Sequence, residues 1–336
     1  MDREIIKIFS YGGAIRNSIE KIIKSGRGAL IVFLNNKKMT KIFNGGFKIN
    51  QEFSAERLAE LAKLDGAIIV DDKLKKILYA NVLLHPDIKI TSSETGTRHQ
   101  AAERTAKQFN TIVLAISEKA RTATVYSGDK KIKLNPLNEL FTKTGEGLKA
   151  LEKNKEIFQS LINRLNASEA LELVVLEDIA LIFQRKRIID TIIKRILIHI
   201  AELGNEGELI EMQLKEISNF VEGEIELIMK DYQDFFDFGS ILKAIDNFNH
   251  NEILNKNTFL NVFLSNKKSD GPFIPKGYRV LKSIPMLLDE NIDSIIEKFG
   301  NLKNLILATT EDFINIKGIG EKKARAIKEY LLKFQI

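Results

Sequence analysis

The hydrophobic pattern of this 336-residue chain changes near residue 145, and this change limits the possible folds more than any other feature. Before it, short apolar runs rich in β-branched residues alternate with glycine, asparagine or charge. After it, glycine is sparse and apolar residues recur with a period of about 3.6, which indicates helices. The length also exceeds what one ordinary hydrophobic core covers. We therefore expect two or three domains of different fold class.

Residues 1–142 predict an α/β domain. Strands are expected at 29–34, 67–70, 111–116 and 123–126, where apolar runs end at turn-forming or charged residues. A helix is expected over 54–63, because Leu58, Leu61 and Ala62 repeat at helical spacing. Strands interspersed with helices indicate a mixed central sheet that is flanked by helices and largely buried.

Residues 143–278 predict a helical spine. Apolar stripes run over 148–165, 171–197 and 214–229, and Gly204 is placed to end the second helix. We find no chemical motif here, so this region is interpreted as a spacer and oligomerisation element. Residues 266–278 form a linker with two prolines and two glycines. An all-helical module over 279–336 is expected to follow.

The composition limits which metal sites and cross-links the chain can form. With no cysteine, the chain can form neither disulfides nor a thiolate zinc site, so oxygen and imidazole ligands favour Mg²⁺ or Mn²⁺. The N-terminus is too charged for a secretory signal, and no uncharged apolar run reaches the roughly 20 residues that a membrane span needs. We expect a soluble, cytoplasmic protein without a membrane partner.

The distribution of charge indicates a further partner. The net charge of +6 is modest, but six of the basic residues lie within 315–336, which suggests a polyanion partner there.

Two short motifs carry most of the functional information. Asp65-Gly66-Ala67 precedes a predicted strand, offering a carboxylate beside a glycine that allows close approach of a ligand. Alone, it is typical of a surface Asp-Gly turn. Gly96-Thr97-Arg98-His99 adds donors for phosphate, a planar cation and an imidazole, at the start of a helix expected from about residue 100 to 107. The alternative is a capped surface helix with solvated charges. Together the motifs predict a site for a nucleotide triphosphate and a divalent metal.

These motifs resemble the nucleotide site of the diadenylate cyclases. Asp65-Gly66-Ala67 matches the family's DGA motif, and residues 98–100 match its RHR motif. The stretches GALIV (28–32), NGGF (44–47), LAELAKLDGA (58–67), LYANV (78–82) and ETGTRH (94–99) are similar to the DNA-scanning branch of that family. Ser117 and Glu118 match a further family position near the triphosphate.

The resemblance implies an enzyme that joins two ATP molecules into cyclic di-AMP and releases two pyrophosphates. Asp65, Arg98 and His99 are the implied catalytic residues, and Asp65 and His99 the implied metal ligands. The nucleotide-binding set is Gly66, Ala67, Leu84, Gly96, Thr97, Ser117 and Glu118. Each site holds one ATP, so two sites must face each other across a subunit contact. The family forms homo-octamers, which the sequence by itself does not indicate.

The chain departs from the family at Gln100, where an arginine is usual. Glutamine keeps hydrogen bonding but loses the charge and the fork of the guanidinium. Two outcomes fit: a working site with altered support, which the intact Asp65, Arg98 and His99 favour, or weakened catalysis. The second would make the chain a DNA-backbone-binding protein that binds ATP with little turnover.

Near the C-terminus, Gly318-Ile319-Gly320 lies between two predicted helices and among Lys317, Lys322, Lys323 and Arg325. Glycines let backbone amides approach a phosphate, while Ile319 is expected in the core, as are Ala324, Ile327 and Leu331. A plain helix corner with solvated lysines is the alternative.

The pattern resembles a helix-hairpin-helix, which binds DNA phosphates without reading bases. Residues 281–313 resemble a degenerate first hairpin, whose turn at Ser283-Ile284-Pro285 lacks the glycines. The family resemblance implies binding of branched or damaged DNA, a role in DNA repair, and lower cyclase activity on branched DNA.

Overall fold

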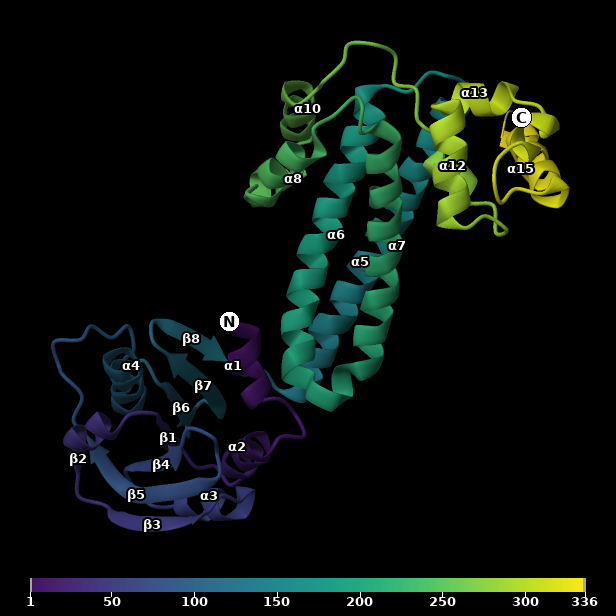
Figure 1. Cartoon of the computed structure of the whole chain (residues 1–336). Coiled ribbons are helices and arrows are strands. Elements are labelled where there is room, and N and C mark those ends of the chain that lie inside the picture. The colour runs from purple at the N-terminus through teal and green to yellow at the C-terminus, as the bar shows by residue number, and fades with distance from the viewer. Residues whose placement is uncertain (1, 335–336) are drawn as a thin grey trace. The chain divides into compact units, whose positions relative to one another are not determined.

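The computed structural model describes residues 2–334, with side chains over residues 3–332. The chain forms two compact units, one comprising Met1–Gly145 and Ile196–Glu211, the other Glu146–Arg195 and Met212–Ile336. The first unit contains the sheet, and the second is helical (Figure 1). The predicted fold classes, α/β followed by all-α regions, are confirmed.

The first unit is built on a mixed sheet in the order β2-β5-β4-β1-β6-β7-β8, with β3 also paired to β5. Strands β1 and β4 run parallel, and the other pairs of the described sheet are antiparallel. The strands are β1 (Ala29–Leu34), β2 (Phe43–Asn44), β3 (Phe47–Glu52), β4 (Ala67–Asp71), β5 (Lys76–Leu84), β6 (Ile112–Ser117), β7 (Thr122–Ser127) and β8 (Lys130–Lys133).

The four predicted strands are confirmed within one residue at each end. Strands β2, β3, β5 and β8 were not predicted from the sequence. Three of them are short or largely polar, and β3 is almost wholly exposed, so the hydrophobic pattern carries no signal for them. In β5 the run is broken by Asn81, which takes a left-handed conformation (φ 55°).

Helices cover both faces of the sheet. Side chains of β1 alternate, with Ile31 and Phe33 packing on one core and Leu30 and Val32 on the other. Helices α2 and α3 cover the first face, and α4 covers the second through Ala102 and Ala106. The helical segments of this part are α1 (Asp2–Ile8), α2 (Ala14–Lys24), the 3-10 turn η1 (Lys37–Ile42), α3 (Ala55–Leu61) and α4 (Thr97–Phe109).

Three long helices, α5 to α7, lie side by side in Figure 1. Within the second unit, ion pairs join α5 to α6 (Arg164 and Asp178) and α6 to α7 (Lys186 and Glu222). The remaining helical segments are α5 (Leu137–Ala170), α6 (Leu176–Leu203), η2 (Gly204–Gly207), α7 (Glu208–Tyr232), α8 (Phe238–Asp246), α9 (His250–Leu254), α10 (Lys256–Ser265), α11 (Tyr278–Lys282), α12 (Asp289–Phe299), α13 (Leu302–Leu307), α14 (Thr310–Ile314) and α15 (Glu321–Phe334).

One predicted helical stripe was wrong at its start. Leu171 and Val175 lie in the turn between α5 and α6 and are 68% and 52% exposed, so the stripe begins only with α6. Both residues lie at helical spacing from the apolar residues that follow them. Periodicity alone therefore could not show that they precede the helix. At the other end, Gly204 follows the last residue of α6 with φ of 60°, as expected for a helix-ending glycine.

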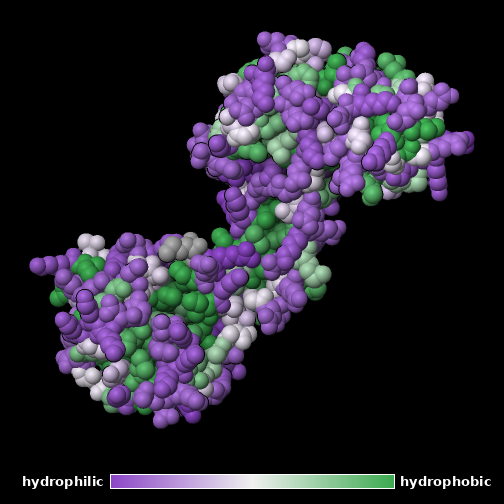
Figure 2. Space-filling model, viewed as in Figure 1, coloured by the Kyte–Doolittle hydropathy of each residue, from purple (hydrophilic) through white to green (hydrophobic). Residues whose placement is uncertain are grey.

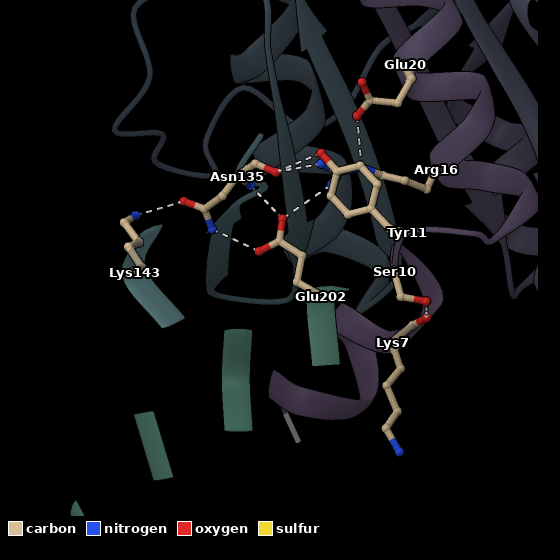
Figure 3. Close-up of polar contacts among 8 residues, drawn as sticks. All are labelled: Lys7, Ser10, Tyr11, Arg16, Glu20, Asn135, Lys143 and Glu202. Carbon is tan, nitrogen blue, oxygen red and sulfur yellow. Dashed lines mark hydrogen bonds and ion pairs between the residues drawn. The ribbon is translucent and has the colours of Figure 1, made fainter. Parts of the chain in front are cut away.

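A buried polar cluster joins the end of α6 to the sheet domain (Figure 3). The Arg16 guanidinium lies 3.3 Å from a Glu202 carboxylate oxygen, and both side chains are only 3% exposed. The Asn135 side chain donates to Glu202 (2.9 Å) and accepts from Lys143 (3.0 Å). Tyr11 packs under the Arg16 guanidinium, 3.9 Å from ring centroid to carbon. This cluster fixes residues 196–211 in the first unit.

The visible face of the molecule is predominantly hydrophilic (Figure 2). Among residues 2–334, no helix has the length and apolar character required to cross a membrane.

Candidate nucleotide and DNA sites

The predicted nucleotide residues gather at one end of the sheet. In the parallel β1–β4 pair, Leu30 lies opposite Ala67, so the residues two positions earlier, Gly28 and Asp65, lie at the same end. In the antiparallel β1–β6 pair, Ala29 lies opposite Ile116, which brings the last residue of β6, Ser117, to that end as well. The site therefore lies at the amino ends of the two parallel strands.

Gly66 is required by the fold as well as by any ligand. Its φ is 85°, and a Cβ would lie 2.9–3.0 Å from the backbone of Asn81 and Val82 in β5. No other residue fits there without moving the strand. Asp65 is exposed directly before β4, while Ala67 is buried in the core. The close contact with β5 thus holds the Asp65 carboxylate at the surface of the sheet end.

Arg98 reaches this sheet end from α4. A Cβ on Gly28 would lie 2.2 Å from the Arg98 Nη1 atom and 3.0 Å from the Ile116 carbonyl oxygen, so the absence of a side chain leaves room for the guanidinium in its observed position. Within the described residues the guanidinium makes no hydrogen bond and no ion pair, which leaves its N–H groups available to a ligand. Sequence reasoning missed Gly28 as a functional position, although it begins the GALIV stretch.

Helix α4 begins at Thr97, three residues earlier than predicted, with Gly96 as its N-terminal cap. Thr97, Arg98 and His99 therefore form its first turn, where backbone N–H groups have no helical acceptor. The positive end of the helix dipole adds to this preference for an anion. The sequence contains no capping side chain at Gly96, which hid the true start.

His99 is held by a network of three further residues, the His99 network. Its Nδ1 lies 2.8 Å from the Tyr126 hydroxyl, which donates to Glu94 Oε1 at 2.7 Å. The Lys131 ammonium pairs with the same Glu94 oxygen at 2.5 Å. Burial lowers the pKa of His99 and raises that of Tyr126, and the hydrogen bond from Lys131 lowers the pKa of Glu94. Sequence reasoning missed Glu94, Tyr126 and Lys131, because only the fold brings them together.

Gln100 supports this network from the helix. Its side-chain Nε2 donates to the backbone oxygen of Glu94 at 2.9 Å. The neutral amide therefore positions the Glu94 backbone, while Lys131 supplies the positive charge beside the Glu94 carboxylate. The fold thus provides local support at the position where the family's arginine is replaced.

The loop before α4 is fastened to the helix by Glu103. Its carboxylate accepts hydrogen bonds from Ser92 Oγ (2.6 Å), the Ser93 backbone (2.9 Å) and Lys107 (2.8 Å). Burial alone would raise the pKa of Glu103, but these hydrogen bonds outweigh it and lower the pKa to about 2. Arg104 adds a hydrogen bond to the Ile90 backbone oxygen (3.0 Å). The loop that leads into the site is therefore ordered by hydrogen bonds to side chains of α4.

The other predicted nucleotide residues lie in different settings. Ser117 accepts a hydrogen bond from the Ala120 backbone (3.1 Å), and Glu118 is exposed in the same turn. Leu84 is 8% exposed and packs in the core beneath α4. No group of three metal-ligating side chains occurs among the described residues.

The predicted DNA hairpin connects α14 to α15. Gly318 has φ of 86°, and Ile319 is 3% exposed in the core of the C-terminal helices, as predicted. Ala324, Ile327 and Leu331 share that core, which confirms the predicted apolar stripe of α15.

The basic residues around this hairpin differ in availability. Lys317 and Lys322 are exposed and make no ion pair with the part of the chain that is described. Lys323 instead donates to Asn291 (2.8 Å) and to the Gly318 carbonyl (3.3 Å), and Arg325 pairs with Glu321. The Lys323 side chain therefore connects the hairpin turn to helix α12.

Comparisons with known protein families match three successive regions of the chain. Residues 16–131 match the family described as the DisA bacterial checkpoint controller nucleotide-binding domain, residues 134–270 match its linker region, and residues 301–330 match the helix-hairpin-helix motif.

Relatives match along almost their whole length. The DNA integrity scanning protein DisA of Clostridium kluyveri is 37% identical over 336 residues, covering 99% of this chain and 95% of the relative. That of Bacillus subtilis is 37% identical, with 98% and 93% covered, and that of Carboxydothermus hydrogenoformans is 38% identical, with 98% and 96% covered. The chain belongs to the family of DNA integrity scanning proteins, and its sheet domain is the diadenylate cyclase domain that its motifs predicted.

Proposed function

We propose that this protein condenses two ATP molecules into cyclic di-AMP and two pyrophosphates, at a site shared by two facing subunits. The observation that carries the proposal is the unpaired Arg98 guanidinium, which lies against Gly28 at the sheet end that also holds Asp65 and Ser117. A partly exposed arginine fork beside a helix N-terminus suits the phosphates of a nucleotide.

The reaction consists of two in-line displacements. In each, a ribose 3′-oxygen attacks the α-phosphorus of the facing ATP, the bond to the β-phosphate oxygen breaks, and pyrophosphate leaves. Asp65 receives the hydroxyl proton or directs it to solvent. Arg98, Thr97 and Ser117 hold phosphates, and Gly66 and the helix start at Gly96 leave room for the nucleotide. Catalysis of this kind depends mainly on positioning and charge neutralisation.

Asp65 and His99 would hold a divalent cation, Mg²⁺ or Mn²⁺, through a carboxylate and an imidazole, which are donor types that these cations accept. Since the described residues contain no cluster of three ligating side chains, the remaining positions would be filled by phosphate oxygens and water, as is common for Mg²⁺. When bound, the cation neutralises charge on the phosphates.

The proposal is tested by incubating the full chain with ATP and Mg²⁺ or Mn²⁺ and identifying nucleotides by mass spectrometry. Cyclic di-AMP is expected from the wild type and a loss of at least about 100-fold from Asp65→Asn. ATP binding without product would refute the cyclase proposal, and Gln100→Arg would then test whether that substitution is the cause.

We further propose that the C-terminal hairpins bind branched DNA through phosphates, and that the protein acts as a homo-octamer in the response to DNA damage. One hairpin per chain binds weakly, so several copies in one oligomer raise the affinity. Addition of four-way junction DNA is expected to lower the rate of cyclic di-AMP formation. Equal rates with and without the junction would refute this regulation.

The DNA contact is tested by changing the two available lysines together. Lys317→Gln with Lys322→Gln should weaken junction binding and reduce the slope of log Kd against log salt by about two, one for each lost phosphate contact. Lys153→Gln, at an exposed position on α5, is the control for altered net charge. An unchanged salt slope in the double variant would place the DNA contact elsewhere.

A further inference from the structure

The His99 network contains three side chains, besides His99 itself, that the binding of a phosphate does not require. Four side chains from three elements and the preceding loop meet there: His99 on α4, Tyr126 on β7, Lys131 on β8 and Glu94 in the loop. Tyr126 is 1% exposed and lies opposite Lys131 in the β7–β8 pair, so the register of the sheet places both residues beside Glu94. These contacts hold the imidazole ring of His99 in one orientation.

The hydrogens in this network can be assigned by counting. Glu94, paired with the Lys131 ammonium, is a carboxylate and can only accept. The single hydroxyl hydrogen of Tyr126 therefore points to Glu94, at 2.7 Å. The hydroxyl oxygen is then left as the acceptor for His99 Nδ1, at 2.8 Å, so Nδ1 must carry a hydrogen. In the neutral imidazole, Nε2 then has none.

We propose that Tyr126 and Glu94 are positioning residues for the cyclase reaction, holding His99 in the Nδ1–H form so that Nε2 presents a lone pair. Within the described residues Nε2 makes no hydrogen bond, and the neighbouring Cδ2 atom lies 3.9 Å from where a Cβ of Gly96 would be, beside the start of α4. His99 then accepts on the nucleotide side and does not donate to a phosphate. This role rests on the proposed cyclase function, but the hydrogen assignment does not.

The test is solid-state NMR of the full chain labelled with ¹³C,¹⁵N-histidine, at pH 8 and without nucleotide. The two neutral forms of imidazole have distinct ¹⁵N and ¹³C shifts, and the His99 signals are identified by their loss in His99→Gln. The wild type should show the Nδ1–H form. Tyr126→Phe removes the acceptor while keeping the ring, and should shift His99 toward the Nε2–H form and lower kcat about tenfold with a smaller change in KM for ATP.

Tyr79→Phe is the matched control, since Tyr79 on β5 packs against the same core and makes no hydrogen bond to the described residues through its hydroxyl. It should keep both the Nδ1–H form and the wild-type kcat. If Tyr126→Phe does not fold, Glu94→Ala tests the same link, because it removes the acceptor of the Tyr126 hydroxyl and frees that hydroxyl to donate to His99 Nδ1. An Nε2–H form in the wild type, or an Nδ1–H form unchanged in the variants, would overturn the proposal. An Nδ1–H form in a protein that makes no cyclic di-AMP would refute the cyclase function and leave the hydrogen assignment intact.

Discussion

Arg98 in the sheet domain and Arg279 at the start of the C-terminal helices carry the same guanidinium in opposite settings. Arg98 is partly exposed, lies against a glycine, and has no protein partner within the described residues. Arg279 is 5% exposed and is surrounded by Glu169, Asn166 and Glu224 from two other helices. An arginine left unpaired at a helix start is available to a ligand, whereas one paired with buried carboxylates holds helices together.

The Arg279 region shows how strongly buried charge is compensated. Glu169 Oε1 accepts from Arg279 (2.9 Å) and from the Tyr232 hydroxyl (2.7 Å). Asp231 accepts the backbone N–H groups of residues 277–279, and burial together with Glu169 raises the pKa of Asp231 to about 7. The Glu169 carboxylate therefore depends on the Arg279 guanidinium, whereas Asp231 is held by backbone N–H groups. Removal of the guanidinium leaves Glu169 buried without its cation, which has a large cost.

The largest expected effect is at Arg279. Arg279→Met should destabilise the helical unit by about 3–5 kcal/mol, because it leaves Glu169 buried without its cation. Thermal and denaturant unfolding of the full chain measure this. Adding Glu169→Gln to Arg279→Met removes the unpaired charge and should recover part of the stability. A single variant as stable as the wild type would show that Arg279 is not structural.

The second effect is at Arg98, where stability should stay constant and activity should fall. Arg98→Lys keeps the charge but loses the fork, and should lower kcat/KM for cyclic di-AMP formation by about 100-fold. Gly28→Ala should act in the same direction, because its Cβ would displace the guanidinium. Wild-type activity in both variants would refute the conclusion that Arg98 binds a ligand.

The smallest effect is at Glu103, a structural charge within the nucleotide region. Its folded pKa of about 2 lies below the ordinary value of 4.5, so its stabilisation is complete above about pH 4.5 and is lost as pH falls toward 2. Glu103→Gln should therefore cost about 2 kcal/mol at pH 7 and clearly less at pH 3. Melting curves of both proteins at the two pH values test this. A difference that does not depend on pH would argue against the charged contacts with Lys107, Ser92 and Ser93.

Much of the fold and part of the site could be predicted from the sequence. Buried strands such as β1, the long helices and the apolar stripe of α15 have strong local periodicity, so their elements were found. The motifs around Asp65 and His99 identified the nucleotide region through their residue types and their resemblance to the diadenylate cyclases. Strand β3 and the start of α4 were missed, because one is exposed and the other has no capping side chain.

The sequence by itself determined the order of fold classes, the absence of cysteine chemistry, and the residues that form the two motifs and the C-terminal hairpin. Only the tertiary structure decided which of these groups are available to ligands. The contact of Arg98 with Gly28, the support of His99 by Tyr126 and Glu94, and the attachment of residues 196–211 to the sheet domain through Arg16 and Glu202 all join residues far apart in the chain. Local propensity and periodicity act over a few residues, whereas these contacts arise from strand register and the packing of distant helices.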